Sequence, residues 1–206
     1  MNTAMTSAGH AHGRMNPARR AMAMLIDPSA EWTRIERESG DPVYLVSRYV
    51  AILALVPAIF GFLGASIVGE VMPATGVMKA SVFDGLFGAI FMYVATFVIV
   101  FLLALITNFL APYFNGERDF DAALKLTVYS FTPVWLAGVF LIMPGLRFLV
   151  LTGFYGLYVL WTGLPRLMKA PPSRARSYVL IVAACGFALI LAAIVTQRVV
   201  FGTRGI

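Results

Sequence analysis

The chain has 206 residues, of which 60% are hydrophobic and 13% are charged, whereas about 25% of the residues in a typical soluble domain are charged. This composition excludes a soluble globular domain, and the unbroken apolar runs exclude a membrane β-barrel, whose strands alternate over about 10 residues. The formal net charge of +6 does not indicate nucleic-acid binding, because the bases lie near the ends of the apolar runs. The sequence therefore predicts an all-α, polytopic membrane bundle.

Residues 1–24 are small and polar, and we expect them to form a disordered cytoplasmic tail. No apolar stretch of about 7–15 residues follows the early arginines, so a cleaved signal peptide is not expected. His10 and His12 offer only two potential ligands on this tail, which is too few for a metal site. The segment therefore carries no predicted chemistry.

A short amphipathic helix is expected to begin at Asp27-Pro28, because aspartate is a good N-cap and proline suits the first helical position. Trp32 and Ile35 lie on its apolar side, and charged residues occupy the other side. Two interpretations are open. The helix either lies in the membrane interface with Trp32 and Ile35 among the headgroups, or packs on neighbouring helices as an ordinary surface helix.

Five apolar segments follow, each long enough to cross a ~30 Å hydrocarbon core as a helix. Pro57 should kink the first segment, and only Pro144-Gly145 separates the third from the fourth, which predicts an antiparallel hairpin. Residues 25–200 would form the membrane domain, and residues 201–206 a short outside tail. The predicted spans are about 48–69, 83–110, 122–143, 146–167 and 177–197.

The distribution of bases predicts the orientation of the chain. Six bases precede or open the first span, two lie in or next to the loop between the second and third spans, and four lie in or next to the loop between the fourth and fifth. Only Lys79, Arg147, Arg198 and Arg204 lie on the opposite side. The positive-inside rule then places the N-terminus in the cytoplasm and the C-terminus outside.

Three stretches resemble the Yip1 domain. They are Asp27-Pro-Ser-Ala-Glu-Trp32 before the first span, Tyr129-Ser-Phe-Thr-Pro133 in the third, and GFYGLYVLWTGLPRLMK from Gly153 to Lys169. The resemblance covers about residues 25–197, is similar to the pattern of bacterial members, and implies five spans with a cytoplasmic N-terminus.

Tyr129 and Pro133 are similar to the Gly-Tyr-x-x-x-Pro motif of eukaryotic Yip1 relatives, with Val128 in place of the glycine. Those relatives bind Rab GTPases and act in vesicle traffic and membrane shaping. A second family motif, Asp-Leu-aromatic-Gly-Pro, is absent, so we do not expect binding of a small GTPase here. The pair is either a partner-binding site or a structural kink, since Pro133 cannot donate a hydrogen bond to the carbonyl of Tyr129. We favour the kink.

The sequence contains no HExxH, CxxC, GxSxG or phosphate-binding glycine loop. Acids and bases lie near span ends, and the polar groups deeper in the spans are mainly hydroxyls. We therefore predict a non-enzymatic scaffold in a bacterial inner membrane, without cofactor or metal. It would contact membrane lipids and associate with itself or with other membrane proteins. A small transporter or channel is the alternative, and a lipid-handling protein is a third interpretation.

Overall fold

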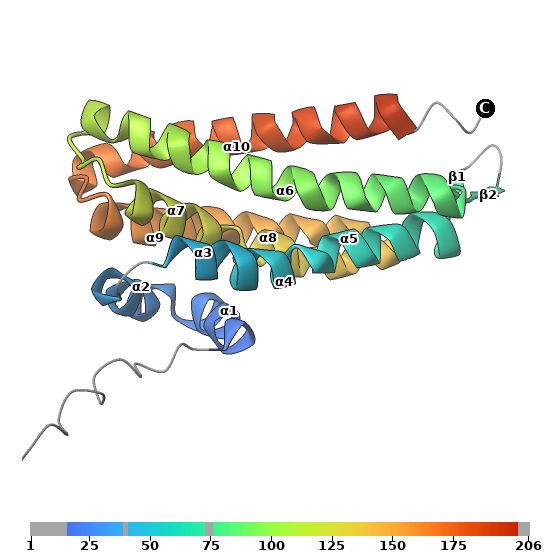
Figure 1. The fold of residues 1–206 in the computed structure, drawn as a ribbon, viewed down its shortest axis with the longest axis horizontal. Coiled ribbons are helices and arrows are strands. Elements are labelled where there is room, and N and C mark those ends of the chain that lie inside the picture. The colour runs from blue at the N-terminus through green and yellow to red at the C-terminus, as the bar shows by residue number, and fades with distance from the viewer. Residues whose placement is uncertain (1–15, 39–40, 73–75, 202–206) are drawn as a thin grey trace, which may run out of the picture.

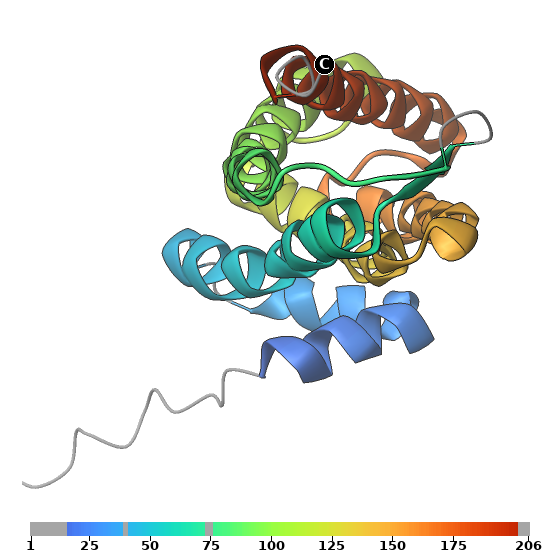
Figure 2. The ribbon, with the colours of Figure 1, turned by 90° about the vertical axis from the view of Figure 1, so that its right-hand side faces the viewer.

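The computed structural model describes residues 16–38, 41–72 and 76–201. Within these residues, five helical segments are long and apolar enough to cross a membrane, and they lie side by side in one bundle (Figures 1 and 2). This confirms the predicted all-α polytopic fold. The segments are Pro42–Val68, Val82–Phe114, Phe120–Ile142, Pro144–Leu167 and Pro172–Val200.

The first span is a succession of short helical pieces rather than one regular helix. It begins at Pro42, earlier than predicted, because the Asp41 side chain accepts a hydrogen bond from the amide of Tyr44 and caps it. The α-helix is interrupted at Ala54, three residues before Pro57, where a proline cannot donate into the preceding turn. The pieces are α3 (Pro42–Tyr44), a π-helical turn (Leu45–Val50), α4 (Ala51–Leu53), α5 (Leu55–Phe62) and a second π-helical turn (Leu63–Val68).

The second and fifth spans are long helices that pack against each other on one side of the bundle (Figure 1). They are α6 (Val82–Leu110), extended by a 3₁₀ turn (Ala111–Phe114), and α10 (Pro172–Phe201). At one end of these two spans, the ring of Phe114 stacks on the ring of Tyr178, with centroids 4.7 Å apart. A short antiparallel hairpin of β1 (Glu70–Met72) and β2 (Gly76–Met78) joins the first span to the second.

The third and fourth spans form the predicted antiparallel hairpin, with Met143 as the only residue between their helical segments. The third span is interrupted at Phe131, two residues before Pro133. Both spans are 3₁₀-helical near the turn that joins them. The pieces are α7 (Phe120–Ser130), α8 (Thr132–Ala137), 3₁₀ turns at Gly138–Ile142 and Pro144–Phe154, and α9 (Tyr155–Leu167).

Two short helices precede the spans, α1 (Pro17–Ile26) and α2 (Pro28–Arg37). The expectation of a disordered tail is therefore wrong for residues 17–24, and residues 1–15 lie outside the described residues. The Asn16 side chain caps α1 by accepting from the amide of Ala18, and Pro17 starts the helix. Figure 2, which looks along the spans, shows α1 crossing their direction on one side of the bundle.

Candidate functional site

Tyr129 lies at the centre of an aromatic cluster beneath α1 and α2. Its ring packs edge-on against Trp32 of α2, with centroids 6.0 Å apart, and against Tyr49 of the first span, at 4.9 Å. Tyr129 and Pro133 are both buried. The structure therefore joins the motif of the third span to the N-terminal segment, which lies almost 100 residues away in the sequence.

Trp32 anchors α2 in the bundle. Its side chain is fully buried, and its indole Nε1–H donates to the carbonyl of Val159, 3.0 Å away. The ring lies over Gly163, where a Cβ in place of the glycine hydrogen would overlap the indole and come within 2.8 Å of Leu126 Cδ1. Glycine at position 163 thus makes room for the tryptophan.

The placement of Trp32 and Ile35 among the headgroups is consequently wrong. Both side chains have 0% exposure and face the protein. The other interpretation of this helix, packing on its neighbours, agrees with the structure. Amphipathic spacing identifies an apolar face, but it does not distinguish a lipid neighbour from a protein neighbour.

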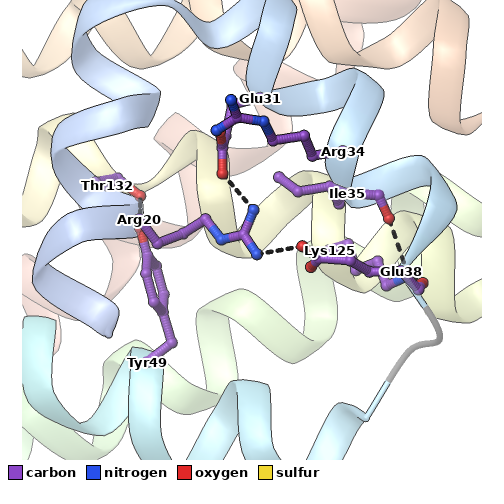
Figure 3. Close-up of polar contacts among 8 residues, drawn as sticks. All are labelled: Arg20, Glu31, Arg34, Ile35, Glu38, Tyr49, Lys125 and Thr132. Carbon is purple, nitrogen blue, oxygen red and sulfur yellow. Dashed lines mark hydrogen bonds and ion pairs between the residues drawn. The ribbon is translucent and has the colours of Figure 1, made fainter. Parts of the chain in front are cut away.

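A buried ion pair connects α1 to α2 (Figure 3). The guanidinium of Arg20 donates to the carboxylates of Glu31 and Glu38, and Arg20 and Glu31 are only 6% and 1% exposed. Burial would lower the pKa of Arg20, but its bond with Glu38 and the charges around it raise that pKa above its ordinary value. Arg20 therefore stays charged, and the two carboxylates compensate for its burial.

Arg20 also reaches the motif residue. Its guanidinium carbon lies 5.9 Å from the centre of the Tyr129 ring, within the range of a cation–π contact. The cluster around Tyr129 thus has an aromatic part, made by Trp32 and Tyr49, and a charged part, made by Arg20 and its two glutamates.

Two bases of the third and fourth spans hold α2 along its length. Lys125 Nζ donates to the carbonyl of Glu38 at 2.8 Å, which places a positive charge at the C-terminal end of α2, where it complements the helix dipole (Figure 3). Arg166 donates to the carbonyl of Ser29 at 3.1 Å and to the hydroxyl of Thr33. These contacts make α2 part of the membrane domain.

The third span is interrupted at Phe131, as a kink near Pro133 requires. The hydroxyl of Thr132, the residue directly after the interruption, lies 2.8 Å from the hydroxyl of Tyr49, and both side chains are buried. Gly156, near the start of α9, is also explained by packing, because a Cβ at this position would lie 2.5 Å from the carbonyl oxygen of Ser130. The kink stays our interpretation of Tyr129 and Pro133, and a partner-binding role stays its untested alternative.

Replacing Tyr129 by phenylalanine should change the free energy of unfolding by no more than about 1 kcal/mol, because the ring contacts remain and only a hydroxyl is lost. Pro133→Ala should be similarly mild, since the surroundings already accommodate the interruption. Thermal unfolding in nanodiscs measures both changes. Well-folded Tyr129→Phe protein that no longer retains partners on extraction from membranes would instead identify the pair as a binding site.

The Yip1 domain matches residues 22–194 of the sequence. The chain belongs to the Yip1 family. The match begins inside α1, which agrees with the structure in assigning part of this helix to the domain rather than to a tail.

Two relatives of this Yip1 protein are bacterial. It is 23% identical over 155 residues to inner membrane protein YohC of Escherichia coli strain K12, an alignment that covers 73% of this chain and 80% of the relative. The protein of the same name from Escherichia coli O6:H1 strain CFT073 gives the same values. No solved structure matches the chain.

The described part of the chain contains no group of three or more His, Cys, Asp or Glu side chains that could hold a metal ion. Sequence reasoning missed Arg20, the most buried base of the cluster. The signal that could have found it is the Asn16-Pro17 start, which predicts a helix, followed by Ala21 and Met24 on the same helical face as Arg20.

Proposed function

We propose that this Yip1 protein is a non-enzymatic membrane scaffold that associates with itself or with other membrane proteins. The proposal rests on how the buried charges are paired. Arg20 and Glu31 neutralise one another between α1 and α2. Charges that serve catalysis or transport are instead directed at a cleft or a water-filled path.

The neighbouring polar groups support the same proposal. Lys125 and Arg166 bond to backbone carbonyls of α2. The cluster therefore holds α1 and α2 at one end of the bundle. A surface whose helices are held rigidly on the bundle suits a protein that binds other chains.

Co-expression of two differently tagged copies, followed by extraction into lipid nanodiscs, tests the association. We expect one tag to recover the other copy, or to recover a second membrane protein in stoichiometric amount. Mixing the two copies only after extraction is the control, because it reports association that forms in the nanodisc preparation. Recovery of a lone chain under both conditions would contradict the proposal.

We further propose that the protein lies in a bacterial inner membrane with its N-terminus in the cytoplasm and its C-terminus outside. The name of the E. coli relative supports the location. The uneven distribution of bases supports the orientation, since cytoplasmic loops are enriched in lysine and arginine.

Single cysteines test the orientation in a Cys185→Ala background. Arg37 of α2 and Val77 of the β-hairpin are both exposed. In intact cells, a membrane-impermeant maleimide should label Val77→Cys and leave Arg37→Cys unlabelled until the membrane is opened. The reverse pattern, or labelling of both from outside, would show that the assigned topology is wrong.

A small transporter or channel is the second candidate, and one observation favours it. Four side-chain oxygens in the second and third spans are buried without a hydrogen-bond partner, on Thr107, Asn108, Thr127 and Ser130. Water along an internal path would satisfy them. Purified protein in liposomes should release no trapped ions if the scaffold proposal holds. Release that Thr127→Val abolishes would favour a channel.

A further inference from the structure

A hollow of about 460 Å³ opens on the bundle surface where the third and fourth spans meet α1. Its volume falls within the ~300–1,000 Å³ of ordinary ligand pockets. The residues around it come from three parts of the chain that are distant in sequence. Pro133, Leu136 and Phe140 line it from the third span, Thr152 and Tyr155 from the fourth, and Leu25 from α1.

The helix geometry explains why the two spans do not close over this space. The third span is interrupted at Phe131, and its Gly138–Ile142 stretch is 3₁₀-helical, as is the Pro144–Phe154 stretch that faces it. In a 3₁₀-helix the side chains at i and i+3 eclipse, so the two surfaces cannot interlock as regular α-helices do. The hollow is therefore a consequence of the irregular helices, and Pro133 of the family motif forms part of its wall.

The hollow offers an apolar surface, because its polar groups are engaged elsewhere. The Thr152 hydroxyl donates to the carbonyl of Leu149 at 2.7 Å. The Tyr155 hydroxyl donates to the carbonyl of Leu25 at 3.1 Å, which also ties the end of α1 to the fourth span. The side chains that remain are aliphatic or aromatic, so the chemistry favours a hydrocarbon occupant.

The depth of the hollow indicates where that hydrocarbon comes from. Tyr155 lies 12 residues before the end of α9 at Leu167, which corresponds to about 18 Å along the helix. The hollow thus lies near the middle of the fourth span, and it opens on the outer surface of the bundle. The substance present at that depth is the acyl chain of a membrane lipid.

The outer face of α1 extends the apolar surface beside the hollow. Met22 and Ile26 are 63% and 76% exposed, and Leu25 is exposed beside the hollow.

We propose that the hollow binds one acyl chain of a phospholipid, with Leu25 of α1 forming part of its wall. The site is independent of the scaffold function, because it needs only the single chain and its lipid.

A phospholipid with a photoactivatable diazirine midway along one acyl chain tests the site. The purified protein is placed in vesicles that contain this lipid, irradiated, and digested for peptide mapping by mass spectrometry. We expect stronger labelling of the residues around Pro133 and Thr152 than of exposed lipid-facing residues such as Val98 of α6 and Leu191 of α10.

Thr152→Phe should fill the hollow and reduce labelling there about fivefold, which corresponds to roughly 1 kcal/mol of lost binding free energy. Leu151→Phe is the matched control, because Leu151 is the neighbouring residue, is 63% exposed and does not line the hollow. It should leave the labelling unchanged. Val139→Trp fills the hollow from the opposite wall and repeats the test if Thr152→Phe folds poorly.

Labelling spread evenly over all lipid-facing surfaces would overturn the proposal, and so would equal losses in Thr152→Phe and Leu151→Phe. A change in the mass of the extracted particle caused by Thr152→Phe would also overturn it, since a protein segment would then occupy the hollow. The two-tag recovery experiment is unaffected by an empty hollow, so failure of this site can be told apart from failure of the scaffold function.

Discussion

Arg20→Met is expected to lower the free energy of unfolding by about 3–5 kcal/mol, the typical result of removing one partner of a buried ion pair. The reason is that Glu31, which is 1% exposed, would keep a buried negative charge without its main partner. Thermal unfolding of the protein in lipid nanodiscs measures the change. Such a loss would show that the ion pair holds α1 against α2.

Two further variants make this prediction specific. Arg20→Met/Glu31→Leu removes both charges and should recover most of the lost stability, because apolar residues of similar size often replace a buried pair at little cost. Arg34→Met removes the other base near Glu31, but its side chain is 64% exposed, so the loss should stay within about 1 kcal/mol. Equal losses for Arg20→Met and Arg34→Met would contradict the account of the cluster.

Trp32→Ala is expected to cost about 3–5 kcal/mol, because a fully buried indole leaves a cavity that its neighbours fill only in part. Trp32→Phe keeps much of the ring but leaves the carbonyl of Val159 without its donor, at a cost of about 1–3 kcal/mol. The matched control is Trp161→Ala on α9, where the side chain is 48% exposed; its effect should stay within about 0.5 kcal/mol.

The order of these three variants separates a buried anchor from a residue in the interface. If Trp32 contacted lipid headgroups, Trp32→Ala and Trp161→Ala would have similar small effects on unfolding. Gly163→Leu adds an independent measurement, because the new side chain would compete with Trp32 for the same space and should destabilise the fold by about 1–3 kcal/mol.

The spans were predictable from the sequence, because the cost of exposing backbone polar groups to lipid leaves few structures for a long apolar run. The turn at Pro144-Gly145 and the interruption near Pro57 were also predictable, since proline acts through local geometry. The span ends differed by several residues at Pro42 and Pro172, where a proline starts the helix outside the apolar run.

The site was less predictable, because it depends on contacts between residues far apart in the sequence. Trp32 and Gly163 are separated by more than 100 residues, and neither an amphipathic pattern nor a lone glycine indicates that one fills the space left by the other. Arg20 was expected to lie in a disordered tail because residues 1–24 are small and polar. Its burial can be inferred only once Glu31 and Glu38 are known to lie beside it.

The mass of the particle extracted directly from its own membrane, with its lipid retained, tests the scaffold proposal most directly. Native mass spectrometry can compare that mass with the 22.4 kDa of one chain. The account predicts a particle that contains at least two protein chains, either copies of this protein or this protein with another membrane protein. A particle that holds a single 22.4 kDa chain and lipid, at the natural level of expression, would contradict it.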